Sequence, residues 1–208
     1  MERPEDIYNR VIELYHKFGI RSVTMDDIAR ELGISKKTLY QVVDDKRDLV
    51  TKVMHWEFDR VNACMENLKV GGTNAIEELL EISRFVNLHL REYSSSLEYD
   101  LRKYYPVIYQ DIHRQKREVM YHTILANIKR GKDEGLYRGE LREEVIAKLY
   151  VSRFESMQED TMFSIEELTS GEIFREIFTY HIMGIANEEG IKIFLKNRHR
   201  LHNSSQET

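Results

Sequence analysis

The chain has 208 residues, of which 41% are hydrophobic and 32% are charged, and its formal net charge is −5. This balance is typical of a globular protein with a buried core, and the lack of a run of about 18 apolar residues excludes a membrane-spanning helix. The N-terminus has no apolar signal segment, so we expect a cytoplasmic protein. Cys64 is the single cysteine, which excludes an intrachain disulfide and a cysteine-built zinc site.

Residues that break secondary structure are sparse, since the chain contains two prolines, Pro4 and Pro106, and ten glycines. Long stretches without either type, and no sustained alternation of apolar and polar positions, predict an all-α fold. In the N-terminal part, the side-chain oxygens of Thr24, Ser35 and either Asp44 or Asp45 suit helix N-caps. We therefore predict four helices, which end near residues 18, 32, 42 and 69.

Gly71-Gly72 is the clearest hinge in the chain, and the apolar periodicity after it predicts further helices. The sequence Ser94-Ser95-Ser96 forms a loop or a cap, and Pro106 suits the start of a helix. We predict a Gly-spaced loop over 131–141 and a frayed polar tail over 199–208. The predicted helices cover residues 73–93, 97–105, 106–132, 143–163, 171–187 and 187–197.

Residues 24–43, TMDDIARELGISKKTLYQVV, meet the steric needs of a helix-turn-helix. Ala29 is small where two short helices must cross, and Gly33, four residues later, permits a left-handed turn. The positions that seal the crossing are apolar, namely Ile28, Leu32, Ile34, Leu39 and Val42. The joint register of these features favours a helix-turn-helix over an ordinary helical hairpin with a solvated Lys36-Lys37 face.

Residues 7–54 resemble the DNA-binding domain of the TetR family of transcriptional regulators. The matching elements are Phe18-Gly19, Thr24–Ile28, Ala29…Gly33-Ile34-Ser35, Lys37-Thr38-Leu39-Tyr40 and Lys46…Leu49, and weaker likeness continues at 134–141 and 184–194. The resemblance implies an all-helical fold, a symmetric homodimer and a C-terminal domain that responds to a small molecule. It implies a helix-turn-helix domain over 1–50, a helical ligand-sensing and dimerisation domain over 51–198, and a polar tail over 199–208.

The resemblance also implies a DNA-contact face around the second helix of the motif. It places Thr24 and Lys46 at phosphates and Lys37 and Tyr40 at the DNA backbone. Helix N-termini and hydroxyl groups suit phosphate oxygens, whereas Lys can donate to guanine and Gln can read adenine. Base reading is left open among Lys36, Thr38 and Gln41. The implied DNA-binding residues are Thr24, Ser35, Lys36, Lys37, Thr38, Tyr40, Gln41 and Lys46.

The sequence departs from the family at the end of the recognition helix. The family usually reads roughly Tyr-His-Tyr-Phe-Pro there, whereas this chain has Tyr40-Gln41-Val42-Val43-Asp44. The change removes an aromatic phosphate contact and a core ring, and Asp44 and Asp45 add negative charge near the DNA. Residues 1–50 hold 9 Lys and Arg against 10 Asp and Glu, so no basic excess marks the domain. Affinity for DNA must therefore come from the placement of individual cations on one face.

Aromatic residues are abundant after the hinge and suit an amphipathic pocket, although ordinary core packing explains each of them as well. The lining stays unassigned among Phe85, Tyr93, Tyr99, Tyr104, Tyr105, Tyr109, Tyr121, Tyr137, Tyr150, Phe154, Met157, Phe163 and Tyr180. His89, His113, His122 and His181 are interpreted as satisfied or solvated side chains. The acidic stretch 155–167 is interpreted as a solvated helix face. No nucleophile elbow, P-loop or dinucleotide motif occurs, so we expect no catalysis, no cofactor and no metal.

We expect a homodimeric regulator that binds double-stranded operator DNA and acts as a repressor, released by a small-molecule effector. The dimer seam is predicted on helices 143–163 and 171–187, through Leu149, Phe154, Ile173, Ile177 and Ile182. Two alternatives stay open. One is a helical interaction protein that keeps the helix-turn-helix as a remnant, and the other is a regulator whose effector is a protein and which has no small-molecule pocket.

Overall fold

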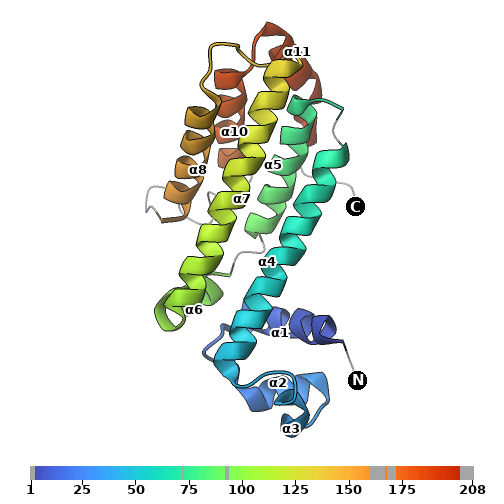
Figure 1. The fold of residues 1–208 in the computed structure, drawn as a ribbon, viewed down its shortest axis with the longest axis vertical. Coiled ribbons are helices and arrows are strands. Elements are labelled where there is room, and N and C mark those ends of the chain that lie inside the picture. Colours follow the sequence, from blue (N-terminus) through green and yellow to red (C-terminus); the bar gives the residue numbers. More distant parts are fainter. Residues whose placement is uncertain (1–2, 72, 92–93, 160–166, 168–171, 202–208) are drawn as a thin grey trace. The chain divides into compact units, whose positions relative to one another are not determined.

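The computed structural model describes residues 3–71, 73–91, 94–159, 167 and 172–201 (Figure 1). Helices dominate these residues and none of them forms a strand, which confirms the predicted all-α class. No helix in this described part of the chain has both the length and the apolarity that a bilayer crossing requires. The helices are α1 (Pro4–Phe18), α2 (Met25–Leu32), α3 (Lys36–Leu39), α4 (Lys46–Gly71), α5 (Ala75–Arg91), α6 (Ser95–Tyr104), α7 (Pro106–Asp133), α8 (Glu143–Glu159), α10 (Glu172–Ile185), α11 (Glu188–Asn197) and the 3-10 turn η1 (Arg198–Leu201).

The chain divides into two compact units. The N-terminal unit comprises residues 1–63 and 93–116, and the C-terminal unit comprises residues 64–92 and 117–208. Helices α4 and α7 therefore contribute residues to both units. The N-terminal unit includes α6, a grouping that the sequence did not suggest. The division into functional domains after residue 50 stays a prediction.

The core of the N-terminal unit joins α1 to α4 with α6 and the first part of α7. Val11 and Tyr15 of α1 are fully buried, and Leu97 and Leu101 of α6 belong to the same apolar cluster. Burial raises the pKa of Tyr15 well above its usual range, so its phenol stays neutral. The packing of α6 against the N-terminal helices makes the unit larger than a three-helix domain.

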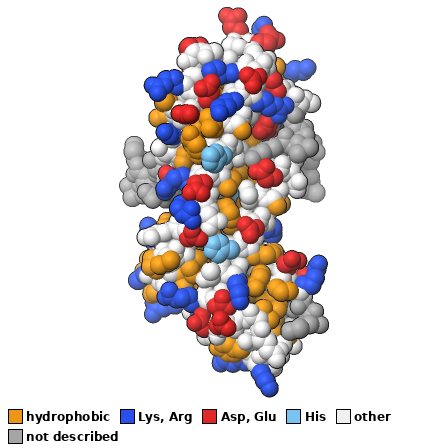
Figure 2. Space-filling model, in the orientation of Figure 1, with side chains coloured by type: hydrophobic (Ala, Val, Ile, Leu, Met, Phe, Trp, Pro, Cys, Tyr) orange, Lys and Arg blue, Asp and Glu red, His pale blue; other side chains and the backbone are white. Residues whose placement is uncertain are grey.

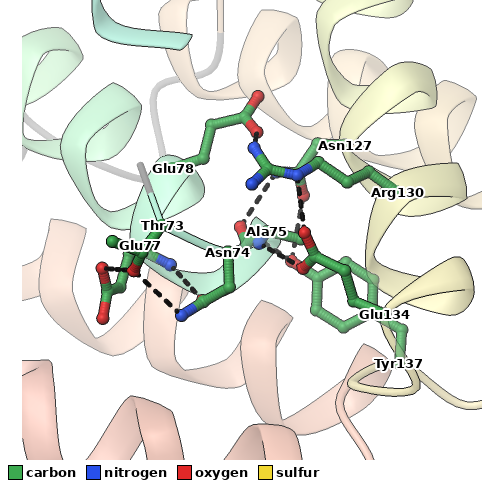
Figure 3. Close-up of polar contacts among 9 residues, drawn as sticks. All are labelled: Thr73, Asn74, Ala75, Glu77, Glu78, Asn127, Arg130, Glu134 and Tyr137. Atoms are coloured by element: carbon green, nitrogen blue, oxygen red, sulfur yellow. Dashed lines mark hydrogen bonds and ion pairs between the residues drawn. The ribbon is translucent and has the colours of Figure 1, made fainter. Parts of the chain in front are cut away.

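In the C-terminal unit, polar contacts hold the start of α5 against α7 and the segment that follows α7 (Figure 3). Asn127 donates to the carbonyl of Ala75 at 2.9 Å, and the Tyr137 hydroxyl donates to Asn127 Oδ1 at 2.9 Å. Arg130 donates to Glu78 at 2.6 Å. Burial raises the pKa of Tyr137, so the phenol remains a donor. Tyr137, one of the candidate pocket residues, is therefore a structural residue.

Two predicted boundaries are wrong. Helix α3 ends at Leu39 rather than near Val42, because the following residues form bonds of the tighter 3-10 type, such as Val42 N–H to the Leu39 carbonyl at 3.0 Å. The chain is not frayed from residue 199, because η1 places Leu201 in the C-terminal core. The predictions for Gly72, Tyr93, Phe163, residues 160–166 and residues 202–208 fall outside the described residues, as do those for the side chains of Phe154 and Met157.

The predicted dimer seam also needs correction on α10. Ile182 is fully buried in the core of the C-terminal unit and is not available to a partner. Among the described side chains, the exposed large apolar ones on α8 and α10 are Val145, the predicted Leu149, Tyr180 and Met183, with Leu149 61% and Tyr180 78% exposed. The reason is helical phase, since Ile182 lies about 200° around the helix from Tyr180, at about 100° per residue.

Candidate nucleic-acid interface

Helix α2 begins with a reciprocal capping box between Thr24 and Asp27. The Asp27 N–H donates to Thr24 Oγ1 at 3.2 Å, and the Thr24 N–H donates to the Asp27 carboxylate at 3.0 Å. The hydrogen bonds from the Thr24 hydroxyl and N–H lower the pKa of Asp27. The Thr24 hydroxyl, which also donates to Asp27 at 2.6 Å, would have to exchange this bond to reach a phosphate.

The turn between α2 and α3 has the geometry that the sequence predicts. Gly33 adopts a left-handed conformation with φ 67°, which an L side chain rarely takes. Its N–H donates to the Arg30 carbonyl at 3.1 Å, and the Ile34 N–H donates to the Ala29 carbonyl at 3.0 Å. These two bonds form a Schellman motif that satisfies the last carbonyls of α2 and redirects the chain into α3.

The seal between the two helices is apolar, as predicted. Ala29 is buried at the crossing, and Ile28, Leu32 and Leu39 are buried around it. Ile34 and Val42 are half-buried against the same core. Val43 is also buried, which the sequence analysis did not predict, so an aliphatic side chain packs in the region where the family usually has an aromatic ring.

Helix α3 is one turn long and is capped by Ser35. The Thr38 N–H donates to Ser35 Oγ at 3.0 Å, and the two hydroxyl groups are 2.7 Å apart. Lys37, Tyr40 and Gln41 are exposed beside this turn, and Tyr40 is an exposed large hydrophobic side chain. The turn therefore presents one cation, one phenol and one amide to solvent.

The two remaining predicted cations are engaged within the protein. Lys36 donates to Asp26 on α2 at 3.0 Å, and this hydrogen bond raises the pKa of Lys36. Lys46 donates to the backbone carbonyl of Arg21 at 3.5 Å, and burial lowers its pKa. In the described residues Lys37 forms no ion pair. Lys37 is therefore the predicted cation that is freest to meet a phosphate.

The distribution of charged side chains over the surface agrees with the near balance of acidic and basic residues in the sequence. Figure 2 shows Lys and Arg side chains interspersed with Asp and Glu side chains on the face that it draws, rather than gathered in one basic patch. A face with such mixed charges would attract a polyanion only weakly over a long range.

Of the two acidic residues before α4, Asp45 is the cap. The Asp48 N–H donates to Asp45 Oδ1 at 2.8 Å, while the Asp44 N–H donates to Asp48 at 3.0 Å. Lys52 Nζ donates one hydrogen bond to the Asp48 carboxylate at 2.7 Å and another to the backbone carbonyl of Val42 at 3.0 Å. Sequence reasoning missed this role of Lys52, which its i, i+4 spacing from Asp48 could have suggested.

Four of the candidate pocket residues belong to the N-terminal unit rather than to the C-terminal domain. They are Tyr99, Tyr104, Tyr105 and Tyr109 on α6 and the first part of α7. Tyr105 and Tyr109 pack against the core of the helix-turn-helix, and the side chains of Tyr99 and Tyr104 lie beside Lys103. The sequence did not reveal this because it could not show that α6 packs on the N-terminal helices.

Comparison with known proteins identifies the N-terminal segment. Residues 7–53 match the family model described as bacterial regulatory proteins, tetR family. An uncharacterized HTH-type transcriptional regulator of Mycobacterium tuberculosis is 43% identical over 54 residues, which are 26% of this chain and 23% of that protein. The sequence similarity to curated relatives therefore spans less than a quarter of their length.

Solved structures match a much larger part of the fold. A transcriptional regulator from Cytophaga hutchinsonii has a TM-score of 0.71 at 21% identity, over 88% of this chain and 98% of that one. A TetR regulator from Haloarcula marismortui has a TM-score of 0.69 at 20% identity, over 88% and 97%. A putative regulator from Saccharomonospora viridis in complex with choline has a TM-score of 0.66 at 16% identity, over 88% and 96%. At these identities the likeness concerns the fold.

Proposed function

We propose that this chain is an operator-binding transcriptional regulator of the TetR family, because residues 7–53 match the model described as bacterial regulatory proteins, tetR family. The observation that carries the proposal is the capped α3 turn, held by the left-handed Gly33 so that Lys37, Tyr40 and Gln41 are exposed together. Such a turn can enter the major groove of DNA.

The contacts divide the proposed roles among the exposed residues. Lys37 and Tyr40 bind the DNA backbone, because a free ammonium and a phenol both donate to phosphate oxygens. Gln41 reads a base, because its amide is exposed whereas Thr38 Oγ1 is engaged with Ser35. Lys36 contributes less, since Asp26 neutralises it. Thr24 and Lys46 keep their proposed phosphate contacts through the start of α2 and of α4.

The regulator acts as a homodimer. Leu149 of α8 and Tyr180 of α10 are exposed, and α8 and α10 are neighbours because Tyr150 and His181 meet with ring centroids 4.7 Å apart. A second copy that covers these side chains would bury an apolar surface and give a two-fold symmetric pair. The two recognition turns must then lie about 34–36 Å apart to reach successive major grooves.

The proposal includes a mechanism and a location: the regulator represses transcription in the cytoplasm, and a small molecule relieves the repression. The Saccharomonospora regulator with choline supports it, because a protein of this fold holds a small ligand. Helix α4 continues from Lys46 to Gly71 without a break and links the recognition turn to the C-terminal unit in sequence. An effector can shift the equilibrium toward release only by its differential affinity for the free and the DNA-bound forms.

Selection of bound sequences from random duplex DNA, followed by titration of the selected duplex at several salt concentrations, tests the function. We expect a palindromic site and a steep negative slope of affinity against salt, because each phosphate contact releases counterions. The double variant Lys37→Ala/Tyr40→Ala should reduce the affinity at least about tenfold, since it removes two backbone contacts.

The matched control is Lys103→Ala/Tyr99→Ala, which removes an exposed Lys–Tyr pair from α6 and leaves α3 unchanged. This control should bind the selected duplex as the wild type does. A chain that enriches no sequence, or whose binding does not change with salt, is not an operator-binding protein. Equal affinities of the two double variants would mean that α3 is not the contact face.

A further inference from the structure

The C-terminal unit contains buried polar atoms that have no hydrogen-bond partner in the described structure. Ser83 on α5 is 0% exposed and His181 on α10 is 8% exposed, yet Ser83 Oγ and His181 Nε2 are both unpartnered. Arg153 Nε on α8 is buried and unpartnered as well. Leaving a buried polar group without a partner costs about 1–3 kcal/mol, so three such atoms indicate a missing partner.

These atoms surround one side chain, Tyr150 of α8. The ring of His181 meets the ring of Tyr150 edge-on at 4.7 Å, and the Arg153 guanidinium lies over the same ring at 5.1 Å. Burial raises the pKa of Tyr150, whereas Arg153 and the Ser83 hydroxyl lower it, which places Ser83 beside Tyr150. Ser83 Oγ nonetheless makes no hydrogen bond of normal geometry. We call Ser83, Tyr150, Arg153 and His181 the polar cluster.

The polar cluster carries a positive charge that no acidic side chain neutralises among the described residues. The groups that act on Arg153 are the phenols of Tyr150 and Tyr180, and Arg153 forms no ion pair there. Burial, followed by repulsion from Arg153, lowers the pKa of His181 to about 3, so its imidazole is neutral near pH 7. The cluster therefore offers one cation and several neutral hydrogen-bonding groups, without a negative partner.

We propose that the polar cluster binds the carboxylate of a small organic acid, and that this acid is the effector of the regulator. The inference rests on the proposed function, because it assigns a chemical class to the proposed effector. A carboxylate accepts hydrogen bonds and carries the charge opposite to that of Arg153, so it can satisfy Arg153 Nε, Ser83 Oγ and His181 Nε2 together.

The residues next to the polar cluster along α5 and α10 are apolar and belong to the buried core of the C-terminal unit. Ile182, the neighbour of His181 on α10, is fully buried, and Leu79 and Leu80 precede Ser83 on α5 in the same apolar core, together with Phe178. A body that lies beside these side chains is apolar. One guanidinium matches one negative charge better than the two of a phosphate. The ligand is thus a monocarboxylic acid with an aliphatic or aromatic body.

The test compares acids with uncharged analogues of the same shape. Octanoate and phenylacetate, and their amides octanamide and phenylacetamide, are titrated into the full-length protein by calorimetry near pH 7. We expect at least one acid to bind with a Kd at least about tenfold below that of its amide, because charge-assisted hydrogen bonds are the stronger ones. Failure of both acids to bind, or equal affinities of acids and amides, would overturn the proposal.

Variants locate the contact. Arg153→Gln should remove the preference for the acid, and Arg153→Lys should restore part of it because the charge returns. Arg142→Gln, an exposed change on the residue before α8, is the matched control and should bind the acid as the wild type does. Circular dichroism and size exclusion identify variants that fail to fold. If Arg153→Gln fails to fold, Ser83→Ala replaces it in the test and should weaken acid binding. An acid preference that survives both Arg153→Gln and Ser83→Ala would place the acid elsewhere.

Failure of this inference is distinguishable from failure of the proposed function. If the wild type binds its selected duplex but neither acid, the regulator stands and the ligand class is wrong. If it binds an acid through Arg153 but enriches no duplex, the site stands and the regulatory function is wrong. If both hold, the acid that binds should also lower the affinity for the duplex, in the wild type and not in Arg153→Gln.

Discussion

The carboxylate of Asp100 on α6 accepts a hydrogen bond from the backbone N–H of Arg21, at 2.8 Å and across 79 residues of sequence. The N–H belongs to the turn between α1 and α2, immediately before the proposed DNA-contact face. Asp100 is buried, so this bond fixes the turn from a part of the chain outside the helix-turn-helix.

Asp100→Ala should therefore lower the free energy of unfolding by about 1–3 kcal/mol, because it leaves the Arg21 N–H without its partner. Urea unfolding followed by circular dichroism measures the change. Tyr104→Phe is the control, since it removes an exposed contact of the Arg21 side chain and should change stability by less than about 0.5 kcal/mol. Equal effects of the two substitutions would contradict the role given to Asp100.

Asp26→Asn should strengthen binding to the selected duplex. The substitution removes the carboxylate that pairs with Lys36 at 3.0 Å, which frees that cation and removes a negative charge near the phosphates. We expect a lower Kd and a salt dependence that is steeper by about one counterion. A salt slope identical to that of the wild type would show that Lys36 does not contact DNA even when it is free.

His181 gives the protein a defined sensitivity to acid. Its pKa is lowered from 6.5 to about 3 by burial, so between these values the unfolded chain binds a proton that the folded chain does not. The free energy of unfolding therefore falls as the pH drops through this window, by up to about 1.4 kcal/mol per pH unit. The same series of urea unfolding curves on His181→Gln should show a shallower fall between pH 6.5 and pH 5. Parallel curves for both proteins would mean that His181 is not buried as a neutral side chain.

Leu149→Glu and Tyr180→Glu should each weaken the dimer. Both side chains are exposed on the described protomer, and a partner that covers them would have to bury the new carboxylate. Analytical ultracentrifugation should find a dimer Kd raised at least about tenfold. The control Lys129→Glu introduces a carboxylate at an exposed position of α7 and should leave the Kd unchanged. An unchanged dimer in both α8 and α10 variants would place the seam elsewhere.

Gly190→Ala should destabilise the C-terminal unit. A Cβ at this position of α11 would clash with the backbone carbonyl oxygen of Leu136, and a backbone atom cannot move aside cheaply. Differential scanning calorimetry should show a lower Tm, with a loss of about 1–3 kcal/mol. Gly139→Ala meets no atom within 4 Å and should behave as the wild type. If both variants melt alike, the close approach of α11 to Leu136 is absent.

The local interactions of the helix-turn-helix could be read from the sequence. Thr24 bonds to Asp27 and Ser35 bonds to Thr38, each three residues away, and Gly33 redirects the chain through its own φ angle. Such interactions need only neighbours in the chain, so residue type and spacing are enough to predict them. For the same reason the all-α class followed from periodicity and from the spacing of breakers.

Tertiary structure alone decided which distant residues meet. Asp100 reaches Arg21 because α6 packs on the N-terminal helices, and Ile182 rather than Tyr180 is buried because of the phase of α10 against its core. Ser83, Arg153 and His181 come from three helices, and their lack of partners depends on how those helices pack. Burial and the satisfaction of polar atoms are properties of the packed interior, so no local pattern of residues encodes them.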